Sequence, residues 1–133
     1  MAVWQAICVC LLDYVLAYTI LGVGGMFKGK FKKPALELAL GVFIALLLRY
    51  IVHIISGAIF YGAWAAWFFS QEGFYKIGES ILGKYSGTAL SIVYSVFYNG
   101  LYMVPEIIIT TVVAAILGNV PQITGVKNPK KDK

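Results

Sequence analysis

The chain has 133 residues, of which 60% are hydrophobic and 13% are charged, and its mean hydropathy is +0.82. Soluble domains are about half apolar and about a quarter charged, so this composition excludes an ordinary soluble domain and predicts an all-α integral membrane protein. The net charge is +5, but eight of the ten lysines form two clusters beside apolar blocks. This pattern carries topological information and does not indicate a nucleic-acid partner.

The first apolar block, residues 3–26, is long enough to cross a bilayer. It starts within three residues of Met1 and has neither a basic leader nor a small-residue cleavage site, so we expect a retained span rather than a signal peptide. Cys8 and Cys10 lie inside this block without neighbouring His or Cys residues. We interpret them as small packing residues, and no metal or other cofactor is predicted.

The second apolar block, residues 34–70, is too long for one crossing. We expect a span over 35–57 that breaks near Ser56-Gly57, followed by an outer aromatic and mixed loop over 58–86. Within that loop, a run of bulky aromatic side chains either anchors the protein at headgroup level as an aromatic belt or belongs to the site. The run is Trp67, Phe68 and Phe69.

The third span is expected over 87–118, which gives a membrane domain over 1–120 and a basic tail over 121–133. The positive-inside rule places both lysine clusters in the cytoplasm. They are Lys28, Lys30, Lys32 and Lys33, and Lys127, Lys130, Lys131 and Lys133. Three crossings then leave the N-terminus outside and the C-terminus cytoplasmic. A start outside the cell without a signal leads us to expect further spans upstream in the complete protein.

Charged side chains inside spans each cost roughly 2.5–3.5 kcal/mol on insertion scales, so they usually face a bundle interior or an aqueous cavity. The ones to explain are Asp13, Arg49, His53 and Glu106. Arg49 and His53 are four residues apart and share a helix face. In the third span the polar groups cover less than half of the helix. Depth estimates from the helical rise bring groups of all three spans into the outer half, which predicts an outward-facing, tyrosine-rich pocket with one carboxylate.

Alternatives remain for several of these residues. Asp13 and Arg49 could form a structural ion pair, or Arg49 could hold His53 or a loop carbonyl. Tyr98, Tyr102 and Glu106 could join helices or contact partner subunits. No phosphate-binding loop, nucleophile elbow or zinc-protease motif occurs, so the sequence predicts neither ATP hydrolysis nor another enzymatic activity.

Three segments, LLDYVLAYTILGVGG, RYIVHIISGAIFYG and YSVFYNGLYMVPE, occur in that order. Together they resemble the thiamine-specific substrate-binding subunits of energy-coupling-factor (ECF) vitamin transporters. The resemblance implies a six-helix bundle in the bacterial plasma membrane, of which this chain holds the C-terminal half. It also implies capture of thiamine from outside, and as partners a transmembrane coupling subunit and two ATPase subunits.

The resemblance also implies a set of thiamine-binding residues. Asp13 takes the acidic position that contacts the aminopyrimidine, and Tyr14 follows it in the motif. The pocket histidine, tyrosine and asparagine of the family match His53, Tyr94 and Asn99. The stacking aromatic is Tyr61 or Trp64. Two alternatives stay open at this stage: a subunit for another vitamin or a thiamine precursor, and a structural membrane subunit that binds no ligand.

Overall fold

The computed structural model describes residues 2–125, and within that range it contains helices and no strands. Most of the predicted tail, including its lysine cluster, lies outside the described residues, as does Met1. The elements are α1 Val3–Cys10, η1 Leu11–Leu16, α2 Ala17–Ile20, η2 Leu21–Gly25, α3 Pro34–Tyr61, η3 Gly62–Trp64, α4 Ala65–Phe69, η4 Glu72–Phe74, α5 Tyr75–Lys84, α6 Gly87–Leu117 and α7 Pro121–Thr124.

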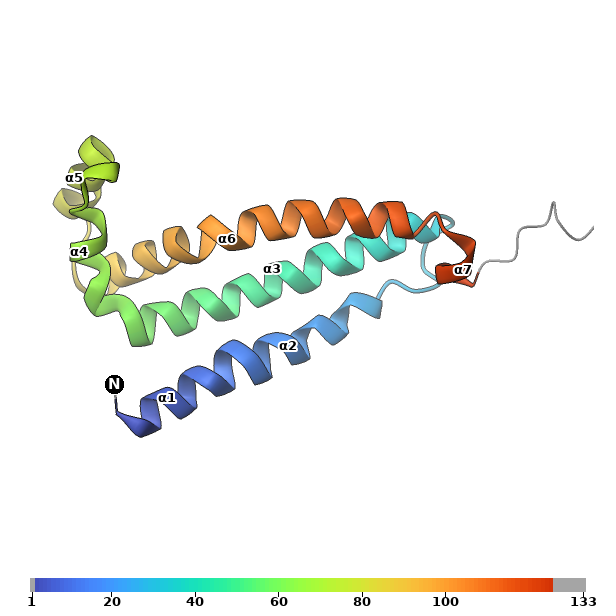
Figure 1. Cartoon of the computed structure of the whole chain (residues 1–133), viewed down its shortest axis with the longest axis horizontal. Coiled ribbons are helices and arrows are strands. Elements are labelled where there is room, and N and C mark those ends of the chain that lie inside the picture. Colours follow the sequence, from blue (N-terminus) through green and yellow to red (C-terminus); the bar gives the residue numbers. More distant parts are fainter. Residues whose placement is uncertain (1, 126–133) are drawn as a thin grey trace, which may run out of the picture.

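Three helical segments are long and apolar enough to cross a membrane, namely Val3–Gly25, Pro34–Phe69 and Gly87–Leu117. The prediction of an all-α membrane protein with three spans is therefore confirmed. The spans run side by side, and α3 and α6 lie antiparallel along most of their length (Figure 1). The basic turn after the first span and α7 lie at one end of the molecule, whereas α4 and α5 lie at the other (Figure 1).

The first span is one continuous helical rod whose winding changes along its length. A π-helical turn, Leu11–Leu16, lies between α1 and α2, and the rod tightens to a 3-10 helix over Leu21–Gly25. The rod crosses α3 most closely at its last turn, where a Cβ on Gly41 would collide with the carbonyl oxygen of Gly24. Toward the N-terminus it diverges from α3, and it is the least buried of the three spans (Figure 1).

Helices α3 and α6 form the centre of the bundle. Leu46, Met103 and Ile107 are buried between them in one apolar cluster. Farther along, Gly57 of α3 lies directly against Ser95 and Asn99 of α6. Small residues permit such close approach of backbones inside a membrane, where no hydrophobic effect drives helices together.

The expected break near Ser56-Gly57 is wrong, because α3 continues to Tyr61 and the chain changes direction at Gly62. Gly57 serves helix packing rather than helix termination. The expected outer loop 58–86 is also largely helical, since it holds the last turn of α3 together with α4 and α5. These two short helices lie across the end of the α3–α6 pair (Figure 1).

The aromatic run of α4 divides between two environments. Phe69 is 2% exposed and packs with Ala65, Ile81 and Tyr94 in an apolar cluster, against which Phe68 also packs. Trp67 is 58% exposed. Of the three aromatic residues, only Trp67 thus faces outward as a belt residue does. Phe68 and Phe69 attach the α4–α5 segment to α6.

Candidate ligand-binding site

A cavity of about 280 Å³ lies between the three spans, in the half of the bundle that α4 and α5 cover. Its lining combines one carboxylate, one imidazole, one amide and four phenols. The lining residues are Asp13, His53, Gly57, Tyr61, Tyr94, Tyr98, Asn99 and Tyr102. Each span contributes at least one of these side chains, so the cavity exists only when all three spans are assembled.

Asp13 and His53 lie next to each other in the lining of the cavity. Asp13 lies in the π-helical turn of the first span, and its Oδ1 is 3.2 Å from Nδ1 of His53 on α3. A π-helical turn adds one residue to a helix and is common at functional sites. The His53 side chain is buried, and its other ring nitrogen, Nε2, has no hydrogen-bond partner among the described residues. An unsatisfied buried nitrogen beside a cavity is a group that a ligand can satisfy.

Asn99 holds the α3–α6 side of the cavity in place. Its Nδ2 donates to the carbonyl oxygen of His53 at 3.2 Å and to that of Ser95 at 2.9 Å. Ser95 donates to the carbonyl oxygen of Ile54 at 2.7 Å. The Tyr102 hydroxyl donates to Oδ1 of Asn99. With its amide engaged on both sides, Asn99 fixes the backbone that carries His53.

Aromatic rings form the wall nearest α4. Tyr94 and Tyr98 are stacked, with ring centroids 5.7 Å apart. Phe68 presents its ring edge-to-face to both of them, at 5.2 Å from Tyr94 and 6.1 Å from Tyr98. Tyr61, at the end of α3, belongs to the same aromatic group and also lines the cavity. Phe68 thus supports two lining rings without lining the cavity itself.

Arg49 and Glu106 form a separate ion pair between α3 and α6, with Nη1 of Arg49 2.6 Å from Oε1 of Glu106. The Arg49 guanidinium also lies over the ring of Tyr18 in the first span, 5.0 Å from its centroid. The structure therefore differs from the alternative in which Asp13 and Arg49 pair. Arg49 links all three spans, and neither Arg49 nor Glu106 lines the cavity.

The structure brings together most, but not all, of the residues singled out from the sequence. Tyr14 and Trp64 lie away from the cavity, with exposures of 63% and 58%. Tyr98 and Tyr102, expected to join helices or contact partners, line it instead. Gly57 was missed as a lining residue, whereas Phe68, for which the sequence left both a belt and a site role open, supports the lining without being part of it. The position of Gly57 on the helix face of Arg49 and His53 was a signal for it, but the Ser-Gly pair was interpreted as a helix break.

The cavity has the chemistry to hold a small cationic or heteroaromatic molecule. A carboxylate attracts a cation or accepts hydrogen bonds from an amino group, and phenol rings stack on flat heterocycles or contact a cation through their faces. An apolar wall with a few convergent polar groups is the usual composition of a small-molecule site. The lining offers no second carboxylate and no nucleophile paired with a base.

Comparison with known proteins gives two matches. The family model described as "Thiamine transporter protein" matches residues 2–71. The "Thiamine transporter ThiT" of Bacillus subtilis (strain 168) is 35% identical over 116 residues, which cover 80% of this chain and 50% of that protein. The chain thus spans about half the length of this curated relative. No solved structure matches.

Proposed function

This chain belongs to the thiamine transporter family, and on that premise we propose that it captures thiamine in the cavity between its three spans. Membership confirms the resemblance inferred from the three sequence segments, and it agrees with a multi-pass membrane protein that transports rather than catalyses. Thiamine as the ligand of this chain is our proposal, since the chain spans half of its curated relative.

The observation that carries the proposal is the meeting of Asp13, His53, Tyr94 and Asn99, from three spans, on one cavity. We assign the Asp13 carboxylate to the amino group of the aminopyrimidine. If Nδ1 of His53 donates to Asp13, its buried Nε2 carries a lone pair that accepts a hydrogen bond from the ligand. A positively charged thiazolium suits the faces of the tyrosine rings.

Tyr61 is our choice for the stacking aromatic. It lines the cavity, whereas Trp64 lies outside the lining and packs edge-to-face against Trp67 with ring centroids 6.0 Å apart. Tyr14 has no place in this assignment, because its exposed ring lies beside Tyr18 on the surface of the first span.

For transport we propose the bacterial plasma membrane, with the α4–α5 end outside and the basic turn in the cytoplasm. Thiamine then enters from outside, and uptake depends on an ECF coupling subunit and two ATPase subunits. One feature supports the need for partners: the sequence has no phosphate-binding loop.

Titration of the detergent-purified chain with thiamine tests the proposal. We expect saturable quenching of tryptophan fluorescence and a matching heat signal in calorimetry. Competition with hydroxymethylpyrimidine then separates thiamine from its precursor, because thiamine alone has a thiazolium to contact the tyrosines. A flat response to all such ligands would contradict the proposal. It would favour a structural subunit that binds no ligand, in which ion pairs such as Arg49–Glu106 only hold helices together.

A further inference from the structure

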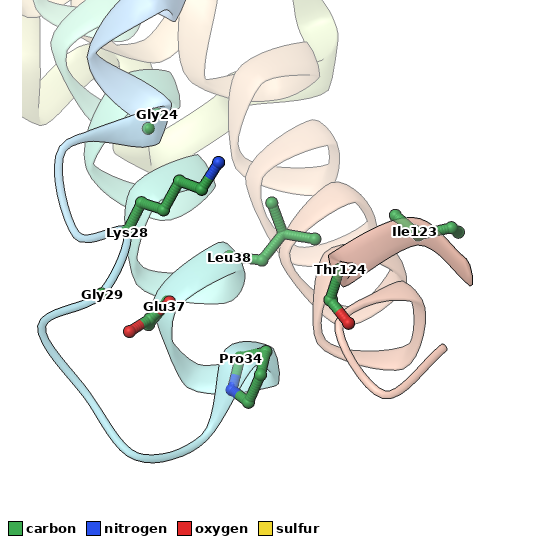
Figure 2. Close-up of a pocket in the computed structure, with 9 residues that line it drawn as sticks. Gly24, Lys28, Gly29, Pro34, Glu37, Leu38, Ile123 and Thr124 are labelled. Atoms are coloured by element: carbon green, nitrogen blue, oxygen red, sulfur yellow. The ribbon is translucent and has the colours of Figure 1, made fainter. Parts of the chain in front are cut away.

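A second cavity, of about 380 Å³, lies at the opposite end of the bundle from the candidate ligand site. It is an open hollow bounded by η2, the basic turn over residues 26–33, the first turn of α3 and α7. Figure 2 shows Lys28 on the turn, Leu38 on α3 and Ile123 on α7 around this space. A Cβ added to Gly25, which also lines the cavity, would meet no atom within 4 Å, so the space is open at this position.

The turn beside this cavity is strongly basic, and the charged residues of the lining itself are Lys28 and Glu37. The basic turn carries four lysines, Lys28, Lys30, Lys32 and Lys33, all exposed. The carboxylate of Glu37 also lines the cavity, and it is engaged by a hydrogen bond from the Phe31 backbone N–H at 2.8 Å. Four positive charges and one negative charge leave a net +3. Among residues 2–125 none of the four lysines forms an ion pair, since both ion pairs in that range lie elsewhere.

The surroundings of the lysines are those of a membrane boundary. The turn joins the ends of two segments that are long and apolar enough to cross a membrane, so we expect Lys28 at the depth of lipid headgroups. Leu38 and the half-exposed Ile123 add an apolar wall to the same cavity. An acidic protein segment would use the charge but not the apolar wall. A phospholipid uses both, because its phosphate and its acyl chains are joined.

We propose that this cavity binds the headgroup of an anionic phospholipid. The lipid phosphate pairs with the Lys28 ammonium inside the cavity, an acyl chain lies along Leu38 and Ile123, and the other three lysines attract the lipid from the rim. Basic residues immediately beside a membrane span attract anionic lipids, with about 1 kcal/mol per residue. The site is separate from the thiamine cavity and stands whether or not the chain binds thiamine.

Lipid retention on the purified chain tests this site. The chain is equilibrated in detergent with phosphatidylglycerol and phosphatidylcholine of identical acyl chains, and retained lipid is counted by native mass spectrometry. We expect phosphatidylglycerol to be retained in preference. Equal retention of both lipids would overturn the proposal. The proposal would also be overturned if inorganic phosphate, at the same concentration as the lipid, protected the chain against thermal unfolding as well as phosphatidylglycerol does. The site would then bind a free anion.

Two pairs of variants locate the lipid. Lys28→Gln is expected to weaken phosphatidylglycerol retention about fivefold. Its control is Lys76→Gln, which changes an exposed lysine on α5 and should leave the retention unchanged. Gly25→Leu adds a bulky side chain to the cavity lining and is expected to displace the lipid. Gly22→Leu is its control, because it adds the same side chain to η2 at an equally open position outside the lining. If the members of either pair behave alike, the lipid does not occupy this cavity.

Discussion

Asp13 and Glu106 are both carboxylates within membrane spans, but their neighbours assign them different tasks. Glu106 is neutralised by Arg49 at 2.6 Å and lies outside the cavity lining. Asp13 lines the cavity, and its described partner is His53, which is charged only if protonated. Asp13 therefore retains capacity for a cationic or amino-bearing ligand, whereas Glu106 is engaged in holding helices together.

Asp13→Asn is expected to weaken thiamine binding about tenfold or more, because hydrogen bonds to a charged group contribute about 1.5–3 kcal/mol. Glu106→Gln is expected to leave the affinity within about threefold, and to lower the thermal stability because Arg49 loses its partner. Calorimetric titration and thermal unfolding of both variants separate the two effects. Equal losses of affinity would refute the assignment of Asp13 to the ligand.

At this scale the sequence predicted which polar residues needed an explanation, but not their partners. The four-residue spacing of Arg49 and His53 fixed a shared helix face. The spacing did not predict which residue of another helix Arg49 or His53 contacts. Those contacts depend on how the helices are rotated and how deep each one lies, and the partner residues are 40 or more positions away in the chain. The pairs Arg49–Glu106 and Asp13–His53 are 57 and 40 residues apart.

Among the elements, the contact between α3 and α6 depends on the absence of a side chain at Gly57. A Cβ there would collide with Ser95 Oγ and would lie 2.9 Å from Asn99 Nδ2. Both groups donate hydrogen bonds to α3 carbonyl oxygens, so neither can move without losing a bond.

Gly57→Ala is accordingly expected to destabilise the protein by about 1–3 kcal/mol, as overpacking of a filled interior does. Gly83→Ala on α5 is the matched control, because its Cβ meets no atom within 4 Å. There the helical propensity of alanine should be neutral or stabilising by up to about 1 kcal/mol. Thermal unfolding in detergent compares them, and a Gly57→Ala protein as stable as the control would contradict the packing role.

The α4–α5 segment supports the site through Phe68. Phe68→Ala removes edge-to-face contacts with Tyr94 and Tyr98, each worth about 0.5–1.5 kcal/mol beyond area burial. We expect thiamine affinity to fall about two- to tenfold. Trp67→Ala, at the adjacent exposed position, should change it less than twofold. Calorimetry is the suitable measurement, since the control removes a fluorophore. Similar affinities for both variants would mean that Phe68 does not position the wall.

Long apolar elements were predictable from hydropathy, and short amphipathic ones were not. The spans are continuous apolar segments, whereas α5 mixes lysines, glycines and a glutamate over ten residues and resembles a loop in composition. Its helical state depends on packing: Gly78 and Ile81 are buried, the latter against α4. The misplaced end of α3 has the same origin, because only the position of α6 distinguishes a packing glycine from a helix-ending one.

For the whole molecule, the orientation in the membrane is the prediction with the widest consequences. The basic turn and the α4–α5 segment lie at opposite ends of the bundle (Figure 1). In a protein with Cys8 and Cys10 replaced by alanine, Lys76→Cys should react with a membrane-impermeant maleimide on intact cells. Lys30→Cys should react only after lysis. The reverse pattern would place the candidate ligand cavity toward the cytoplasm and contradict the proposed capture from outside.

The number of spans followed from composition, but their arrangement required the three-dimensional structure. Residues 3–26 and 87–118 predicted the first and third helices to within a residue or two of Val3–Gly25 and Gly87–Leu117. Hydropathy contains no information on which faces meet. The convergence of polar groups from three spans was inferred from their helix faces and depths, and the π-helical turn that contains Asp13 had no recognisable sequence signature.

The divergence of the first span from α3 has a thermodynamic consequence for binding. Asp13 is carried by the least buried of the three spans, so a ligand that engages both this carboxylate and α6 also draws that span toward the bundle. Part of the intrinsic affinity then goes into ordering a helix, and amide hydrogen exchange over residues 3–16 should slow when the cavity is filled. Any neighbour that restrained this span beforehand would tighten binding without touching the ligand.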